Sequence, residues 1–123
     1  MLLNRGSLNG SRIISPQSVE ALTARHRAGM FDHTFKRNLD WSLGFLLNTP
    51  TPDPDLPYAY DPQASPRTFG HGGAESSGAY CDPERALVVA YVFNGQPGED
   101  RHHERRKELV RAVYEDLGFA DNA

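Results

Sequence analysis

The sequence predicts an α+β domain with a small antiparallel sheet of about three to four strands and a helix near each end of the chain. Two observations indicate the sheet: an Asp-Pro-Glu-Arg turn at residues 82–85 and an uninterrupted apolar run at residues 86–93. A third, the helical spacing of apolar residues between 99 and 117, indicates the C-terminal helix. The length of 123 residues suits one domain, so residues 1–123 are treated as a single unit.

Composition excludes several classes of protein. The chain is 38% hydrophobic, with a mean hydropathy of −0.59 and a net charge of −3, so we expect neither a membrane nor a nucleic-acid partner. Its one cysteine, Cys81, cannot form an intrachain disulfide.

The start of the chain turns polar after Leu3 and lacks the apolar region of a signal peptide. We therefore expect a cytoplasmic location for the chain as written, and a periplasmic or secreted one if a longer parent carries a leader.

The first half of the chain predicts one helix and one strand. Glycines around residues 6–10 indicate a tight reversal. Ser15 and Pro16 then begin a short helix, because serine caps free N–H groups and proline suits the first helical position. Residues 25–40 show no clear period and predict an irregular connection. Residues 41–47 predict a strand with a glycine in its middle.

A long loop is expected to follow. Residues 48–66 contain six of the nine prolines, which excludes a helix or a central strand. Loops of this length inside a compact domain often form part of a binding site, although a variable insertion without function is an equal alternative.

The second half predicts a hairpin and a helix. One strand ends at Cys81, and residues 86–93 form the next, which we expect to be a central strand covered on both faces. Residues 99–117 form the C-terminal helix, with Gly118 as its terminator. One apolar face of this helix is expected to contain five residues, namely Leu109, Val110, Val113, Tyr114 and Leu117.

The most informative segment is Phe-Gly-His-Gly-Gly-Ala at residues 69–74. Three glycines around His71 allow close approach of another group to the backbone, and backbone N–H groups there could bind an anion or an oxyanion. The alternative is a glycine-rich bulge at a sheet edge.

This segment, with residues 78–85 and 87–94, closely resembles the third-motif region of serine hydrolases of the class C β-lactamase, D-Ala-D-Ala carboxypeptidase and esterase family. Residues 1–16 and the Trp-Ser-Leu-Gly-Phe sequence at 41–45 are also similar to that family. The resemblance covers nearly the whole chain but only the C-terminal third of a family member. It implies part of a β-lactamase/transpeptidase-like fold, and hence a partial domain.

The resemblance also implies site residues. His71 stands where the family has a lysine or histidine that assists proton transfer or binds a substrate carboxylate. Gly72 and Gly73 complete this substrate-binding motif, and Ala74 would supply a backbone N–H to the oxyanion hole. Histidine in place of lysine resembles the esterase and peptidase relatives more than the β-lactamases.

The family's nucleophile is absent from this chain. Neither Lys36 nor Lys107 follows a serine by three residues, so no S-x-x-K motif exists, and no tyrosine begins a Y-x-N motif. Ser76 and Ser77 lie near the histidine of the third motif, but the G-x-S-x-G pattern fails. We expect both serines to be ordinary loop hydroxyls.

Other candidate residues predict no chemistry. Adjacent positions on a helix diverge by about 100°, so His102 and His103 are expected at a solvated helix end rather than at a metal site. The basic residues 105–107 are likewise expected to face solvent, and Cys81 to be half-buried. We expect neither a metal nor a cofactor.

The sequence therefore predicts a truncated domain, the C-terminal part of a serine β-lactamase-like hydrolase, inactive on its own. The alternative is a non-catalytic interaction module. The apolar run at 86–93 lacks enough cover, so either a homo-oligomer or a missing N-terminal catalytic portion is the expected partner. A small-molecule ester, amide or peptide is expected as substrate only when the missing catalytic portion completes the domain.

Overall fold

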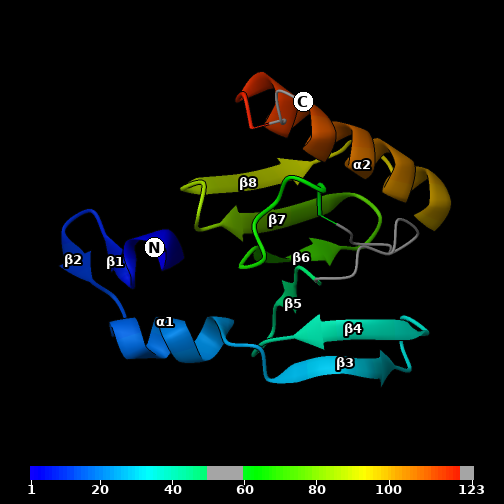
Figure 1. The fold of residues 1–123 in the computed structure, drawn as a ribbon. Helices are drawn as coiled ribbons and strands as arrows, with labels where there is room; N and C mark the ends of the chain where they lie inside the picture. Colours follow the sequence, from blue (N-terminus) through cyan, green and yellow to red (C-terminus); the bar gives the residue numbers. More distant parts are fainter. Residues whose placement is uncertain (50–59, 120–123) are drawn as a thin grey trace.

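In the computed structural model, which describes residues 1–49 and 60–119, the chain forms an α+β fold (Figure 1). The predicted class is confirmed, but the sheet is larger than expected: six antiparallel strands in the order β3-β4-β5-β6-β7-β8, beside a two-stranded hairpin. The elements are η1 (Leu2–Asn4), β1 (Ser7–Leu8), β2 (Ser11–Arg12), α1 (Pro16–Thr23), β3 (Arg27–Asp32), β4 (Arg37–Trp41), β5 (Leu46–Leu47), β6 (Phe69–Gly73), β7 (Ser77–Asp82), β8 (Leu87–Val92) and α2 (Glu99–Asp116). No helix among the described residues is long and apolar enough to cross a membrane.

The N-terminal elements follow the local signals in the sequence. Asn9 and Gly10 turn the β1–β2 hairpin with φ of 49° and 80°, the positive values that an Asn-Gly turn favours. Helix α1 begins at Pro16, and the Ser15 hydroxyl accepts the N–H of Ser18 at 3.0 Å. The predicted reversal and helix start are confirmed.

Residues 25–40, expected to be irregular, instead contain the β3–β4 hairpin, so that prediction is wrong. Asp32 organises its turn by accepting the N–H groups of Thr34 at 2.9 Å and Phe35 at 3.1 Å. The Phe35 hydrogen bond is the main reason that the pKa of Asp32 lies below its ordinary value. Most of β3 is exposed, so its apolar residues do not show the alternation of a half-buried strand.

Residues 41–47 do not form the single strand that was expected. Strand β4 ends at Trp41, a turn occupies residues 42–45, and Trp41 pairs with Leu46 on β5. Gly44 has a φ of 91° and lies in this turn rather than in the middle of a strand.

The predicted turn at residues 82–85 does connect two antiparallel strands, β7 and β8. However, β8 is the last strand of the sheet and pairs only with β7, so its prediction as a central strand is wrong. Its residues alternate between half-buried and exposed, and Val88 and Val92 are 61% and 83% exposed. An uninterrupted apolar run also fits an edge strand that has cover on one face.

Helix α2 supplies that cover and packs across β7 and β8 (Figure 1). Its most buried residues recur every four positions, which places them on one face: His102, Arg106, Val110 and Tyr114. His102 is 0% exposed and Arg106 4%, so the expectation that both face solvent is wrong. Phe93, directly after β8, packs against His102, so the buried face of the helix begins in its first turn.

The end of α2 is nearer to the prediction. Gly118 has a φ of 70°, and the Phe119 N–H donates to the Tyr114 carbonyl at 2.9 Å in a Schellman arrangement. Leu117, expected on the apolar face, is 51% exposed.

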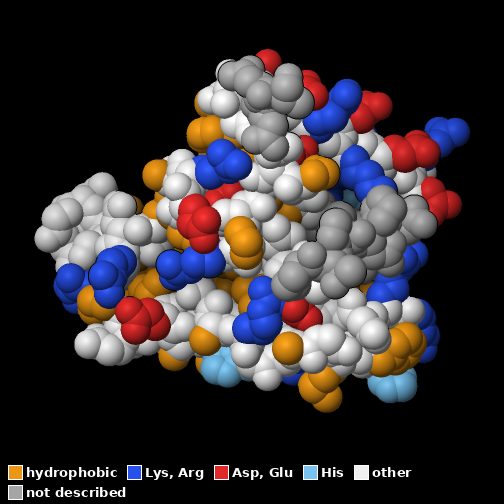
Figure 2. Space-filling model, viewed as in Figure 1, with side chains coloured by type: hydrophobic (Ala, Val, Ile, Leu, Met, Phe, Trp, Pro, Cys, Tyr) orange, Lys and Arg blue, Asp and Glu red, His pale blue; other side chains and the backbone are white. Residues whose placement is uncertain are grey.

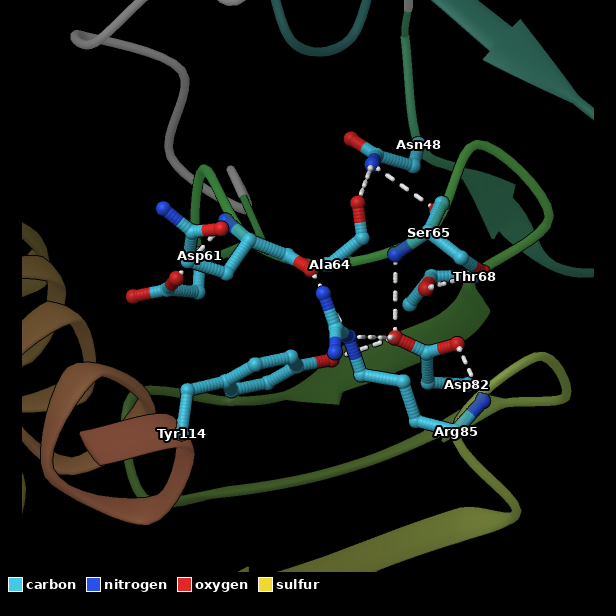
Figure 3. A network of polar contacts seen from close by, with 9 residues as sticks. Asn48, Asp61, Ala64, Ser65, Thr68, Asp82, Arg85 and Tyr114 are labelled. Atoms are coloured by element: carbon cyan, nitrogen blue, oxygen red, sulfur yellow. Dashed lines mark hydrogen bonds and ion pairs between the residues drawn. The ribbon is translucent and has the colours of Figure 1, made fainter. Parts of the chain in front are cut away.

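A buried carboxylate joins three parts of the fold (Figure 3). Asp82 is 0% exposed and accepts hydrogen bonds from the Ser65 N–H at 2.9 Å and the Tyr114 hydroxyl at 2.8 Å. The Arg85 N–H donates to its second oxygen at 3.3 Å. Asp82 therefore connects the segment before β6, the β7–β8 turn and α2.

The same network fixes the described part of the proline-rich loop at residues 48–66. The side-chain amide of Asn48 donates to the carbonyls of Ala64 at 3.2 Å and Ser65 at 3.0 Å (Figure 3). Residues 60–66 contain no helix or strand, as predicted, and residues 50–59 lie outside the described residues.

Glycines on β6 and β7 leave room for the tyrosines that β7 and β8 carry on the face toward α2. A methyl group on Gly70 would overlap the carbonyl oxygen of Ala79 and the backbone of Tyr80. A methyl group on Gly78 would instead overlap the ring and hydroxyl of Tyr91, which lies opposite it on β8. The first obstacle is backbone and the second is a side chain, so the two glycines have separable roles.

We predict that Asp82→Asn lowers the free energy of unfolding by about 2 kcal/mol, because an amide cannot accept all the donors that surround Asp82. Burial alone would raise the pKa of Asp82, but the hydrogen bonds from Ser65, Tyr114 and Arg85 outweigh it and keep the pKa below its ordinary value of 3.8. The stabilisation is therefore complete above that value and is lost as the pH falls through the lower pKa of the folded state. Urea denaturation from pH 7 to pH 2 should show the wild type and the variant converging below about pH 4.

Asp116→Asn is the matched control, since Asp116 is exposed and the chemical change is identical. A difference that stays constant across the whole pH range would contradict the assignment to the Asp82 carboxylate.

We predict that Gly78→Ala lowers the free energy of unfolding by about 2 kcal/mol through steric overlap with Tyr91. In a Tyr91→Ala background the same substitution should lower the free energy of unfolding by less, because the tyrosine ring that the new methyl group would overlap is absent. Gly70→Ala should lower the free energy of unfolding equally in both backgrounds, because its methyl group would overlap the backbone of β7. Denaturant titrations of this double-mutant cycle measure the coupling; equal costs of Gly78→Ala in both backgrounds would rule out the proposed overlap.

Candidate functional site

The candidate site is centred on His71, in the middle of β6. His71 pairs with Ala79 on β7, which in turn pairs with Ala90 on β8, so these three side chains lie on the same face of the sheet. This is the face opposite α2, and all three residues are exposed. The structure therefore places the predicted histidine on an open surface of small side chains.

A shallow hollow of about 440 Å³ lies beside the histidine. Its lining consists of six small residues, one histidine, one tyrosine and one valine: His71, Gly72, Gly73, Ser77, Gly78, Ala79, Ala90, Tyr91 and Val92. The hollow thus brings together three of the four predicted site residues. Small side chains leave the backbone of β6 accessible to a bound molecule.

The imidazole of His71 is held on one side by its own strand. Its Nδ1 atom lies 2.6 Å from the carbonyl oxygen of Gly72. A carbonyl oxygen can only accept, so Nδ1 carries the proton and donates it, and in the neutral ring the lone pair is on Nε2. This tautomer suits a group that exchanges a proton at Nε2.

Trp41 is a neighbour of the site that the sequence analysis did not include. Its ring centroid is 5.7 Å from that of His71, and its Nε1–H donates to Asp32 at 3.1 Å. Asp32 therefore orients Trp41, and Trp41 contacts the imidazole. The sequence carries no signal for this contact, because it depends on the pairing of β4, β5 and β6.

The predicted oxyanion donor, Ala74, begins the turn between β6 and β7. The carbonyl of Ala74 accepts from the Gln96 amide at 3.3 Å, and the next carbonyl, that of Glu75, accepts from Arg105 at 2.6 Å. Arg105 also donates to the Gly95 carbonyl at 3.0 Å. The turn is thus fixed to α2 and to the segment before it, so the backbone beside His71 has a defined position.

The two serines near the motif occupy different positions. Ser76 lies in the turn, and Ser77 begins β7 opposite Gly73 and lines the hollow. Within the described residues, no hydrogen bond joins either serine to His71. No Ser–His pair of a hydrolase is present in this part of the structure.

His102 and His103 are less exposed than the predicted solvated helix end. His102 packs its ring against Phe93 with a centroid distance of 6.0 Å and accepts from Arg105 at 3.4 Å. Burial is the main cause of its lowered pKa, and the neighbouring guanidinium of Arg105 adds to it. His103 lies 3.4 Å from Glu99. The described residues contain no group of three potential metal ligands.

Cys81 is not the half-buried residue that was expected. It is 6% exposed and packs with Leu47 and Phe69 under the N-terminal segment. Burial, and to a lesser degree the charge of Asp82, raises the pKa of its thiol to about 11. A thiol with this pKa is a poor nucleophile at neutral pH.

Comparison with known proteins supports the resemblance drawn from the motifs. A β-lactamase family model matches residues 2–113. A penicillin-binding protein homolog from Caulobacter crescentus is 31% identical, with a TM-score of 0.65, over 90% of this chain and 28% of that one. A β-lactamase from Mycobacterium bovis shares the fold at 22% identity and a TM-score of 0.69, over 94% of this chain and 40% of that one. A search of curated proteins gives no match.

The chain thus spans less than half the length of these two solved relatives. The family model, however, covers most of the chain, including β6 with His71 and the β7–β8 hairpin. By this match and by its fold, the chain belongs to the β-lactamase family.

Proposed function

We propose that this chain is the C-terminal part of a serine β-lactamase-like hydrolase of the esterase or peptidase type. The observation that carries the proposal is the position of His71: an exposed imidazole above a glycine-lined hollow, with Nδ1–H donated to its own strand. In this proposal Nε2 of His71 exchanges a proton during acyl transfer. Gly72 and Gly73 admit the substrate, and the N–H of Ala74 stabilises the oxyanion.

The hollow favours a neutral substrate group. None of the described residues that line it is Lys, Arg, Asp or Glu, so it offers no permanent charge to a substrate carboxylate. A small ester, amide or peptide is the proposed substrate class. Because the sequence has no S-x-x-K motif, the nucleophile must come from a further segment, and we infer that the chain is inactive alone.

A non-catalytic interaction module is the second candidate. It is supported by the sheet face opposite α2, where Val88 and Val92 are 61% and 83% exposed. Soluble monomers rarely expose large apolar patches. We propose that either a second copy of the chain or an N-terminal catalytic portion covers this face.

A hybrid enzyme tests the catalytic proposal. This chain replaces the matching segment of the Caulobacter crescentus homolog, and acylation by a fluorescent penicillin and turnover of a chromogenic ester are compared with the parent. We expect His71→Ala to slow the reaction of the hybrid by about 100-fold, in the range that general acid–base catalysis supplies. The isolated chain should show no turnover above background.

The control is His33→Ala, which removes an exposed histidine of the β3–β4 hairpin. A folded hybrid that reacts equally well without the His71 imidazole would refute the assigned role. Turnover by the isolated chain would refute the proposal that the nucleophile comes from a further segment.

Light scattering tests whether a second copy of the chain covers the exposed face of the sheet. We expect the isolated chain to be dimeric at micromolar concentration, and the double substitution Val88→Glu, Val92→Glu to make it monomeric, because charges at these positions would be desolvated in an interface. The matched control places glutamates at Met30 and Phe31, which are also exposed but lie on β3. A monomeric wild type would count against both the dimer and the interaction module.

A further inference from the structure

A second cavity, of about 580 Å³, lies where the N-terminal segment and α1 meet β6 and β7. None of its lining residues belongs to the hollow beside His71. Its volume lies within the range of about 300–1,000 Å³ that small-molecule sites occupy. The proposed hydrolase function assigns no role to this cavity.

The inner wall of the cavity is apolar. It includes Leu2 from η1, Val19 from α1, Leu47 from β5, Phe69 from β6 and Cys81 from β7. Four of these are buried residues of the protein, and Leu2 packs against the cluster that Leu47, Phe69 and Cys81 form. These residues give the cavity an apolar floor.

Arginines surround the apolar wall, although the net charge of the whole chain is −3. Figure 2 shows basic side chains beside hydrophobic ones where the N-terminal segment meets the body of the molecule. Three arginines line the cavity: Arg5, Arg25 and Arg67. Arg5 forms an ion pair with Glu20 at 3.1 Å, and Arg25 forms one with Asp40.

Arg67 differs from the other two arginines. It is exposed, and within the described residues it has neither a hydrogen bond nor an ion pair. The other two guanidinium charges are balanced by carboxylates, so one positive charge at the cavity is uncompensated. A guanidinium group binds a carboxylate through two parallel hydrogen bonds.

We propose that this cavity binds an amphiphile with a single carboxylate and an unbranched apolar chain. The carboxylate pairs with Arg67, and the apolar chain lies against Leu2, Val19, Leu47 and Phe69. One uncompensated charge favours a monoanion over a more highly charged group.

Decanoate is the probe, with decanol as its neutral counterpart, and both are titrated into the whole chain by calorimetry. We expect decanoate to bind, decanol to bind about tenfold more weakly, and Arg67→Gln to weaken decanoate binding about tenfold, the usual effect of losing one charge-assisted hydrogen-bonded pair. Arg101→Gln is the matched control, because Arg101 is an exposed arginine on α2, outside the cavity. It should leave the affinity unchanged.

Amide chemical-shift mapping locates the bound probe. The expected shifts are at Thr23, Arg67 and Phe69, which line the cavity, and should be small at Ala90 and Val92. Ala24→Trp, a substitution on the cavity wall, should block binding while the chain stays folded by circular dichroism. The proposal is overturned by absence of decanoate binding at millimolar concentration, by equal affinity for decanol, by an unchanged Arg67→Gln variant, or by shifts confined to the exposed face of β8.

Discussion

The buried carboxylate of Asp82 is the interaction on which the arrangement of the fold depends. An ionised group is buried without large cost only where donors surround it, and here the donors come from the segment before β6, from the turn after β7 and from α2. Its position therefore fixes the entry into β6 and the contact of α2 with the sheet. Ser65 lies four residues before β6, the strand that contains His71, so the network fixes the segment that leads into the candidate site.

The two faces of the sheet have different roles. Toward α2, glycines on β6 and β7 make room for tyrosine rings, and the helix buries them in the main core. On the opposite face the same strands present His71 and small side chains to solvent. A second carboxylate, Asp32, holds the β3–β4 turn and Trp41, and Trp41 contacts the imidazole. The candidate site thus has defined neighbours on its own sheet, and the sequence contains no S-x-x-K motif.

Local chemistry explains which elements the sequence could predict. The Asn-Gly turn, the Ser15 cap, the Asp-Pro turn after β7 and the C-terminal Gly118 are each determined by a few adjacent residues. The β3–β4 hairpin could not be predicted in this way. Strand β3 shows no alternation because most of its residues are exposed, and the Asp32 hydrogen bonds that fix its turn come from the backbone of the following residues.

The sequence by itself determined the α+β class, the principal turns, the two helices and the absence of an S-x-x-K motif. These features reside in short motifs or in composition. Only the tertiary structure decided that β8 is an edge strand, that His102 and Arg106 are buried, and that Trp41 lies beside His71. Each of these depends on which strands pair and which face a helix covers, and such long-range contacts leave no local pattern in the sequence.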